Sequence, residues 1–229
     1  MTTITVIFTC FNRKEKTLQC IRSLSEGNKQ LAFSYVIVDD NSTDGTREAL
    51  EALKQEGTDL TLLSGTGSLF WAGGMRRGIA YAKEHTKTDY YLLVNDDVDF
   101  RPQVITEMVG AIQTGEKPYR NDCVLVGPMC DEAGNFSYGG IRYQKGIHYD
   151  EVKPQDADLS CDSFNMNCLL MPQEIFRKVP NFDEHYIHSL ADFDYGLSMK
   201  RLGIPVYVYN FYAGVCPDND PKGGWTDTS

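Results

Sequence analysis

The sequence predicts an α/β fold: a doubly wound, mainly parallel sheet with a small antiparallel excursion in its second half. Two observations lead to this prediction. Through the first half of the chain, β-branched apolar runs alternate with stretches of helical periodicity. After Pro118, the sequence has shorter runs typical of strands, many aromatic residues and pairs of turn-forming residues. Parallel neighbours need crossover helices, whereas short strands joined by tight turns pair antiparallel.

The first half contains four runs of apolar and β-branched residues that we expect to form buried strands, at 4–9, 35–40, 60–64 and 90–97. The helix after the first run should bury one face, made by Leu18, Ile21 and Leu24. Ser42 or Thr43 is expected to cap the next helix, and Gly57 to end it.

In the second half, residues 120–170 are expected to form the antiparallel excursion. A helix should follow within 185–203, beginning near Leu190, and 204–209 should form the last strand. The polar residues from Cys216 onwards are expected to be loop.

Composition limits the function. A chain of 229 residues fits one hydrophobic core. Its net charge of −10 repels a polyphosphate backbone and argues against nucleic acid as a partner. The seven cysteines contain no C-x-x-C pair, which argues for reduced thiols and against a disulfide framework or structural zinc. No window approaches the roughly 20 apolar residues of a membrane span, so we expect a cytoplasmic protein.

Acidic pairs follow two of the expected strands: Asp39 with Asp40, and Asp96 with Asp97. Ligands of a doubly wound sheet bind outside the carboxyl ends of its strands. Crowded carboxylates there need compensation, and Mg²⁺ or Mn²⁺ can provide it while also binding phosphate oxygens. Such a pocket could hold a diphosphate. For Asp39 and Asp44, a role as helix cap or solvated turn remains equally open.

The glycine-rich segments give weaker evidence for a nucleotide-binding motif. In "GTGSLF", Phe70 stands where a dinucleotide fingerprint has its third glycine, and no phosphate loop with its lysine exists. In "WAGGMRRG", Gly74 permits close backbone approach. Arg76 or Arg77 could neutralise a diphosphate or could face solvent.

Asp192 would lie in the first turn of the expected helix after Leu190, where the dipole favours a carboxylate that can face the ligand edge. The alternative for Asp192 is a purely capping role. For Asp194, this capping role is the favoured interpretation. His185 and His188 could bind a metal if the helix began earlier; otherwise they are loop residues.

Five segments, taken in order, resemble the motifs of family-2 glycosyltransferases of GT-A fold, most closely bacterial members that build surface polysaccharides, rhamnosyltransferases among them. The segments are "VIFTCFNR", "VIVDDNSTDGT", "WAGGMRRGIAYA", "LLVNDDV" and "FDEHYIHSLADFDYGLSMKRLGIPV". The resemblance implies an inverting transfer of a hexosyl group from a nucleoside-diphosphate sugar to a saccharide hydroxyl in polysaccharide biosynthesis.

The resemblance also assigns roles to residues. Asp192 matches the general base, although Ala191 replaces the glutamate that often precedes it. Asp97 is the expected ligand of Mn²⁺ or Mg²⁺, because Asn95 stands at the first position of the D-x-D motif. Asp40 matches the aspartate that contacts the nucleotide base. The full set expected to bind substrate is Thr9, Cys10, Asn12, Asp40, Trp71, Gly74, Arg77, Asn95 and Asp96.

A single GT-A domain over 1–229 follows, with a nucleotide-binding half at 1–118, an acceptor-side half at 119–215 and a flexible tail at 216–229. The donor is expected to be linked to UDP or dTDP, and the acceptor to be a saccharide, free or lipid-linked. Peripheral association with the inner face of the membrane, a further tail beyond Trp225 and the oligomeric state stay open.

Two rival functions remain at this stage. A nucleotidyltransferase would carry a glycine-rich loop with arginine directly after the first strand, whereas this chain has Cys10-Phe11-Asn12-Arg13. A non-catalytic module that binds a sugar nucleotide or a glycan is conceivable because of Ala191.

Overall fold

The computed structural model describes residues 1–144, 148–187 and 190–216. Its main sheet has seven strands in the order β13-β6-β12-β4-β1-β2-β3. The strands of the first half pair in parallel: β1 (Thr2–Cys10), β2 (Leu31–Asp39), β3 (Leu60–Ser64) and β4 (Tyr90–Val94). Most of their residues are buried, because helices cover the sheet. The four predicted strands are confirmed.

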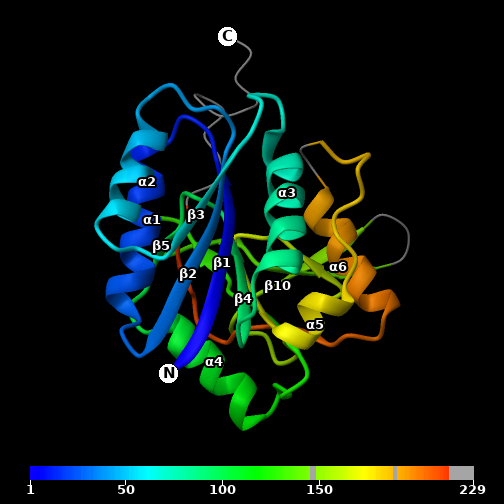
Figure 1. Cartoon of the computed structure of the whole chain (residues 1–229). Helices are drawn as coiled ribbons and strands as arrows, with labels where there is room; N and C mark the ends of the chain where they lie inside the picture. The colour runs from blue at the N-terminus through cyan, green and yellow to red at the C-terminus, as the bar shows by residue number, and fades with distance from the viewer. Residues whose placement is uncertain (145–147, 188–189, 217–229) are drawn as a thin grey trace.

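Helices lie on both sides of this sheet. Figure 1 shows α1 (Lys14–Gly27) and α2 (Thr46–Gln55) on one side and α3 (Phe70–His85) on the other, as a doubly wound sheet requires. A fourth helix, α4 (Val104–Thr114), lies at the end of the molecule near the N-terminus. The inner face of α1 is confirmed at Ile21 and Leu24, both buried, while Leu18 is only partly buried.

The prediction that Ser42 or Thr43 caps the second helix is wrong. α2 begins at Thr46, whose amide donates to Asp44 Oδ1 over 3.0 Å. Ser42 and Thr43 bind Asn12 instead: the Asn12 amide donates to Ser42 Oγ over 3.0 Å, and the Thr43 amide donates to Asn12 Oδ1 over 2.7 Å. The turn after β2 is thereby tied to the turn after β1.

The antiparallel excursion is confirmed. β12 (Cys168–Pro172) is antiparallel to both β4 and β6 (Val124–Val126), and β13 (Val206–Val208) closes the main sheet. One small sheet contains β10 (Tyr149–Val152), β9 (Gly140–Tyr143) and β11 (Ser163–Phe164). Another contains β5 (Asp99–Phe100), β14 (Gly214–Val215), β7 (Met129–Cys130) and β8 (Phe136–Tyr138). The strand expected at 204–209 is confirmed as β13, but it is not the last one, because β14 follows it.

Two further helices complete the second half, α5 (Gln173–Lys178) and α6 (Ala191–Arg201). α6 begins directly after Leu190, as predicted, and Leu190 has a positive φ of 69°. All seven cysteines are free thiols, as expected. No helix in the described ranges is both long and apolar enough to cross a membrane. The predicted tail lies outside the described residues except for Cys216, which is buried.

Gly74 sets how closely α3 approaches β1. A Cβ placed on Gly74 would stand 2.2 Å from Thr9 Oγ1 and 2.6 Å from Thr9 Cβ, both part of a buried strand. The helix can therefore pack on the strand at this point only without a side chain. Gly110 in α4 offers a contrast, since a Cβ there would meet nothing within 4 Å.

We predict that Gly74→Ala lowers the free energy of unfolding by about 1–3 kcal/mol through overpacking. Gly110→Ala, the matched control, should raise it by about 0.5–1 kcal/mol, because alanine costs less entropy in a helix. Urea unfolding of both variants measures the difference. Equal effects of the two substitutions would show that the close approach at Gly74 carries no strain.

Candidate active site

A charge cluster lies where β4 ends and α1 begins. Arg13 Nη1 contacts Asp97 Oδ2 at 2.8 Å and Asp96 Oδ1 at 3.3 Å. The side chains of Asp96 and Asp97 are only 4% and 9% exposed, and that of Arg13 is 20% exposed. Thr17 Oγ1 donates to Asp96 Oδ2 over 3.2 Å. Burial, followed by the charge of Asp97, raises the pKa of Asp96 to about 7, and Arg13 opposes this shift.

The second oxygen of Asp97 contacts the end of the described chain. Cys216 Sγ lies 3.6 Å from Asp97 Oδ1, and Asn167 Nδ2 donates to the same sulfur over 3.3 Å. Burial and then the charge of Asp97 raise the pKa of the Cys216 thiol, so the thiol keeps its proton and donates it to the carboxylate. Asp97 is thus connected to the residue that precedes β12.

Asp192 is joined to the same series of contacts through Met166. Its Oδ2 accepts from the Met166 amide over 3.4 Å, and its Oδ1 accepts from the Phe193 amide over 2.9 Å. Met166 is the neighbour of Asn167, so two adjacent residues connect the surroundings of Asp97 to Asp192. Burial raises the pKa of Asp192 to about 6, against the two amides, which lower it. The predicted location of Asp192 in the first turn of a helix is confirmed.

Asn95 and Trp71 meet beside the cluster. Trp71 Nε1 donates to Asn95 Oδ1 over 2.9 Å, and the Asn95 amide donates to the Asn167 carbonyl over 3.4 Å. Trp71 also packs on Phe182, with ring centroids 5.7 Å apart. The start of α3 is therefore fixed to the same place as the end of β4.

Asp40 holds the loop between β3 and α3. Its buried carboxylate accepts four backbone hydrogen bonds, from the amides of Thr66, Gly67, Leu69 and Phe70 over 2.8 to 3.2 Å. Both oxygens are thereby committed to the loop. A contact of this side chain with a nucleotide base stays a prediction and would need one of these bonds to be given up.

The first-strand turn presents one side chain to solvent. Thr9 is buried and donates to the Val38 carbonyl over 3.0 Å, and Cys10 is buried with a thiol pKa raised by that burial. Asn12 is exposed and has a positive φ of 50°. Of these predicted contacts to the nucleotide, Asn12 alone has an accessible side chain. Gly74 faces Thr9, so its role in the fold is packing.

The predicted arginine of α3 lies apart from the acidic cluster. Arg77 is exposed and forms no ion pair with the described residues. Arg76 donates to the carbonyls of Asp183 and Tyr186, each over 3.2 Å. His185 precedes α6 and binds Asp183 at 2.6 Å, as expected of a loop residue, whereas His188 lies outside the described residues.

Sequence reasoning missed three participants, Arg13, Asn167 and Cys216. The sequence position of Arg13 could have indicated a role, because it is the basic residue nearest the first-strand turn. That turn lies at the edge of the sheet where the acidic side chains meet. Asn167 and Cys216 carried none, since their contacts with Asn95 and Asp97 join distant parts of the chain.

Aromatic rings gather beside Phe193, the residue that follows Asp192. Tyr149 lies edge-on to Phe193, with centroids 6.0 Å apart, and 6.4 Å from Tyr143. Tyr149 is 48% exposed. Burial first, and then the charge of Asp192, raise the pKa of Tyr143, which places that tyrosine near the carboxylate.

Residues 5–171 match the family model described as Glycosyl transferase family 2. The chain belongs to this family. No curated protein sequence matches the chain.

Solved structures support the GT-A fold of this family-2 glycosyltransferase. S. aureus TarS 1-349 in complex with UDP-GlcNAc is 14% identical, with a TM-score of 0.68 over 100% of this chain and 61% of that one. The mannosyltransferase PcManGT from Pyrobaculum calidifontis, in complex with GDP-Man and Mn²⁺, is 16% identical, with a TM-score of 0.60 over 97% of this chain and 58% of that one. The chain spans about three fifths of each.

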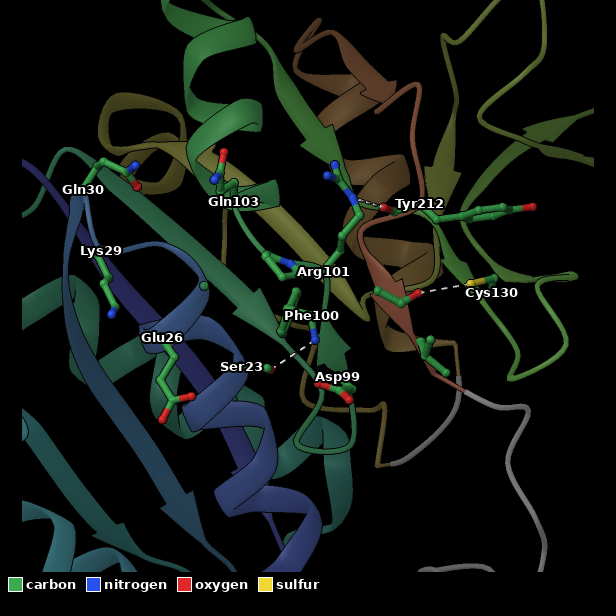
Figure 2. Close-up of a pocket in the computed structure, with 14 residues that line it drawn as sticks. Ser23, Glu26, Lys29, Gln30, Asp99, Phe100, Arg101, Gln103, Cys130 and Tyr212 are labelled. Atoms are coloured by element: carbon green, nitrogen blue, oxygen red, sulfur yellow. Dashed lines mark hydrogen bonds between the residues drawn. The ribbon is translucent and has the colours of Figure 1, made fainter.

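The chain also has a pocket outside the cluster described above. It measures about 850 Å³ and lies between the end of α1, β5 and β14, lined among others by Glu26, Lys29, Arg101 and Tyr212 (Figure 2). None of the predicted site residues lines it. Acidic and basic side chains both line the pocket, and this mixture indicates no particular class of ligand.

The acidic cluster can hold one hard cation through Asp97. In the described ranges, no group of three or more His, Cys, Asp or Glu side chains is arranged to bind a metal. One carboxylate with water and phosphate oxygens is nevertheless a common set for Mg²⁺ or Mn²⁺. Asp97 fits that set on condition that Arg13, which contacts Oδ2, moves away.

We predict that Asp40→Asn lowers the free energy of unfolding by about 1–3 kcal/mol, because the amide nitrogen cannot accept the two hydrogen bonds of the oxygen it replaces. Hydrogen exchange at residues 66–70 should become faster in the same variant. Asp89→Asn is the control: this carboxylate also accepts from a backbone amide, that of Thr3, but in an exposed place, so its loss should be smaller. Unchanged protection of the loop would contradict the anchoring role of Asp40.

Proposed function

We propose that this chain transfers a hexosyl group from a nucleoside-diphosphate sugar to a saccharide hydroxyl with inversion, and that Asp192 is its general base. The observation that carries the proposal is the connection from Asp97 through Cys216, Asn167 and Met166 to Asp192. It links a carboxylate suited to a leaving diphosphate to one suited to an attacking hydroxyl through a short series of hydrogen-bonded residues. Membership of family 2 supports the reaction class.

The chemistry needs both carboxylates. The acceptor oxygen bonds to the anomeric carbon, the bond from that carbon to the diphosphate oxygen breaks with its electron pair leaving on the diphosphate, and the acceptor proton moves to Asp192. A divalent cation held by Asp97 would supply Lewis-acid stabilisation of the leaving group. A single displacement with the base opposite the leaving group inverts the anomeric configuration.

The surroundings of Asp192 suit a base. A pKa of about 6 leaves the carboxylate ionised at neutral pH while keeping more proton affinity than a solvated aspartate. The amides of Met166 and Phe193 fix its orientation. Asp194, two positions on, instead forms an ion pair with Arg201 at 3.4 Å, which fits the structural role expected for it.

The rings of Tyr143, Tyr149 and Phe193 support a saccharide as acceptor. Aromatic faces beside a polar group suit a sugar ring, which has an apolar face and hydroxyl edges. A lipid-linked saccharide at the cytoplasmic face of the membrane, in polysaccharide biosynthesis, is the acceptor we favour. For the donor we favour a UDP- or dTDP-linked hexose, rhamnose included; the two similar structures are complexes with UDP-GlcNAc and with GDP-Man.

We predict that Asp192→Asn lowers kcat by about 10²–10⁴-fold, because the amide cannot accept the acceptor proton. The donor is first chosen by screening nucleotide sugars with Mn²⁺ for thermal stabilisation, since a ligand of the folded state raises its apparent stability. Transfer is then measured by detection of the glycosylated product, and donor affinity by calorimetry.

Asp194→Asn is the matched control, with the same chemical change one half-turn along α6. It should keep turnover within about threefold of the wild type, as expected for an ion pair with little free-energy value. Wild-type turnover in Asp192→Asn with donor binding intact would refute the assignment of the base. Donor binding without any product from the wild-type chain would favour the non-catalytic binding module.

We further predict an acid limb in the pH profile of kcat/KM. The base must be deprotonated in the free enzyme, so kcat/KM should fall about tenfold per pH unit below the pKa of Asp192, about 6, and level off above it. Steady-state rates from pH 5 to 8 measure the limb, and Asp194→Asn should preserve it. A rate that stays constant down to pH 5 in a folded enzyme would contradict the prediction.

A further inference from the structure

Arg13 contacts the oxygen of Asp97 that a cation would bind. Its Nη1 lies 2.8 Å from Asp97 Oδ2, while the other oxygen contacts Cys216. Among the described residues, no second lysine or arginine lies within ion-pair distance of Asp96 or Asp97. One guanidinium therefore compensates two nearly buried carboxylates, and the cluster keeps a formal charge of −1 when both are ionised.

A guanidinium and a divalent cation are alternatives at this oxygen. Both bind the same lone pairs, and their positive charges repel at close range. The backbone of Arg13 is fixed, because its carbonyl accepts from the Thr17 amide over 2.9 Å in the first turn of α1. Its side chain is long and one-fifth exposed, so it can leave the carboxylates without disturbing that turn.

We propose that Arg13 competes with the divalent cation for Asp97 and thereby makes cation binding depend on the nucleoside diphosphate. This inference rests on the proposed function. The diphosphate supplies oxygen ligands for the cation and new anionic partners for the guanidinium, to which arginine binds well. The chain then takes up cation and diphosphate together, and by linkage each raises the affinity of the other.

A purely structural Arg13, which only fastens α1 to the end of β4, has a different signature. Its removal would destabilise the fold and leave the affinity for a cation unchanged or weaker. Competition requires the opposite: removal of the guanidinium frees Asp97 Oδ2 and raises that affinity. Cation binding in the absence of nucleotide therefore separates the two roles, and it needs no assay of transfer.

The experiment titrates Mn²⁺ into nucleotide-free protein and follows free Mn²⁺ by electron paramagnetic resonance. Arg13→Gln should bind Mn²⁺ about tenfold or more tightly than the wild type, because a repelling unit charge is removed. Arg47→Gln is the control: it removes an arginine that lies 3.6 Å from Asp39, at the end of β2, and changes the net charge equally. Its Mn²⁺ affinity should stay within about twofold of the wild type, because solvent and salt screen distant charges.

Addition of UDP gives the second readout. It should raise Mn²⁺ affinity strongly in the wild type and much less in Arg13→Gln, where the competitor is already gone. Should Arg13→Gln fail to fold, the double variant Arg13→Gln/Asp96→Asn removes one charge of each sign and keeps Asp97. It too should bind Mn²⁺ more tightly than the wild type.

Mn²⁺ affinity equal to or weaker than that of the wild type in a folded Arg13 variant would overturn the inference. A wild-type chain that still transferred sugar would leave the proposed function standing. Conversely, absence of transfer and of nucleotide binding would end the proposed function, while the nucleotide-free titration would still decide the competition at Asp97.

Discussion

The structure depends on how the acidic groups at the carboxyl edge of the parallel sheet are compensated. Asp40 is satisfied by amides of the loop after β3, which are fixed parts of the backbone. Asp97 is compensated by Arg13, a side chain that can rotate away. A carboxylate bound to backbone amides gives up hydrogen bonds that order a loop when it changes partners, whereas one paired with a long side chain does not. The kind of partner therefore distinguishes Asp40, which orders a loop, from Asp97, for which we propose an exchange of partners.

Much of the fold could be predicted from the first half of the sequence, because a strand covered on both faces shows a continuous apolar run, as in β4, whose five residues are all buried. Less of the fold could be predicted from the second half. β12 lies antiparallel between β4 and β6, and no local pattern specifies that insertion. β14 is two residues long and exists because it pairs with β5 and β7, so its sequence alone carries no strand signal.

The candidate site also contains residues whose positions could be predicted from the sequence and residues whose contacts could not. The positions of Asp97, after a buried strand, and of Asp192, in the first turn of a helix, could be predicted; their roles stay predictions. The position of Arg13 after the first strand could be seen in the sequence, but its partners could not be assigned, because they lie more than 80 positions along the chain and only the folded sheet brings them together. The error over Ser42 and Thr43 has a related cause: Asn12, from another turn, binds both and leaves the start of α2 to Asp44.

Met166 and Asn167, just before β12, set the relation between the two carboxylates. The Met166 amide binds Asp192, while Asn167 binds the Cys216 sulfur with its side chain and the Asn95 amide with its carbonyl. These residues are buried and directly precede a central strand, so they cannot shift without disturbing the sheet. The antiparallel insertion of β12 places this rigid pair of residues between the hydrogen-bond partners of Asp192, the proposed base, and those of Asp97, the proposed cation ligand. In the proposed function, the pair fixes the position of one carboxylate relative to the other.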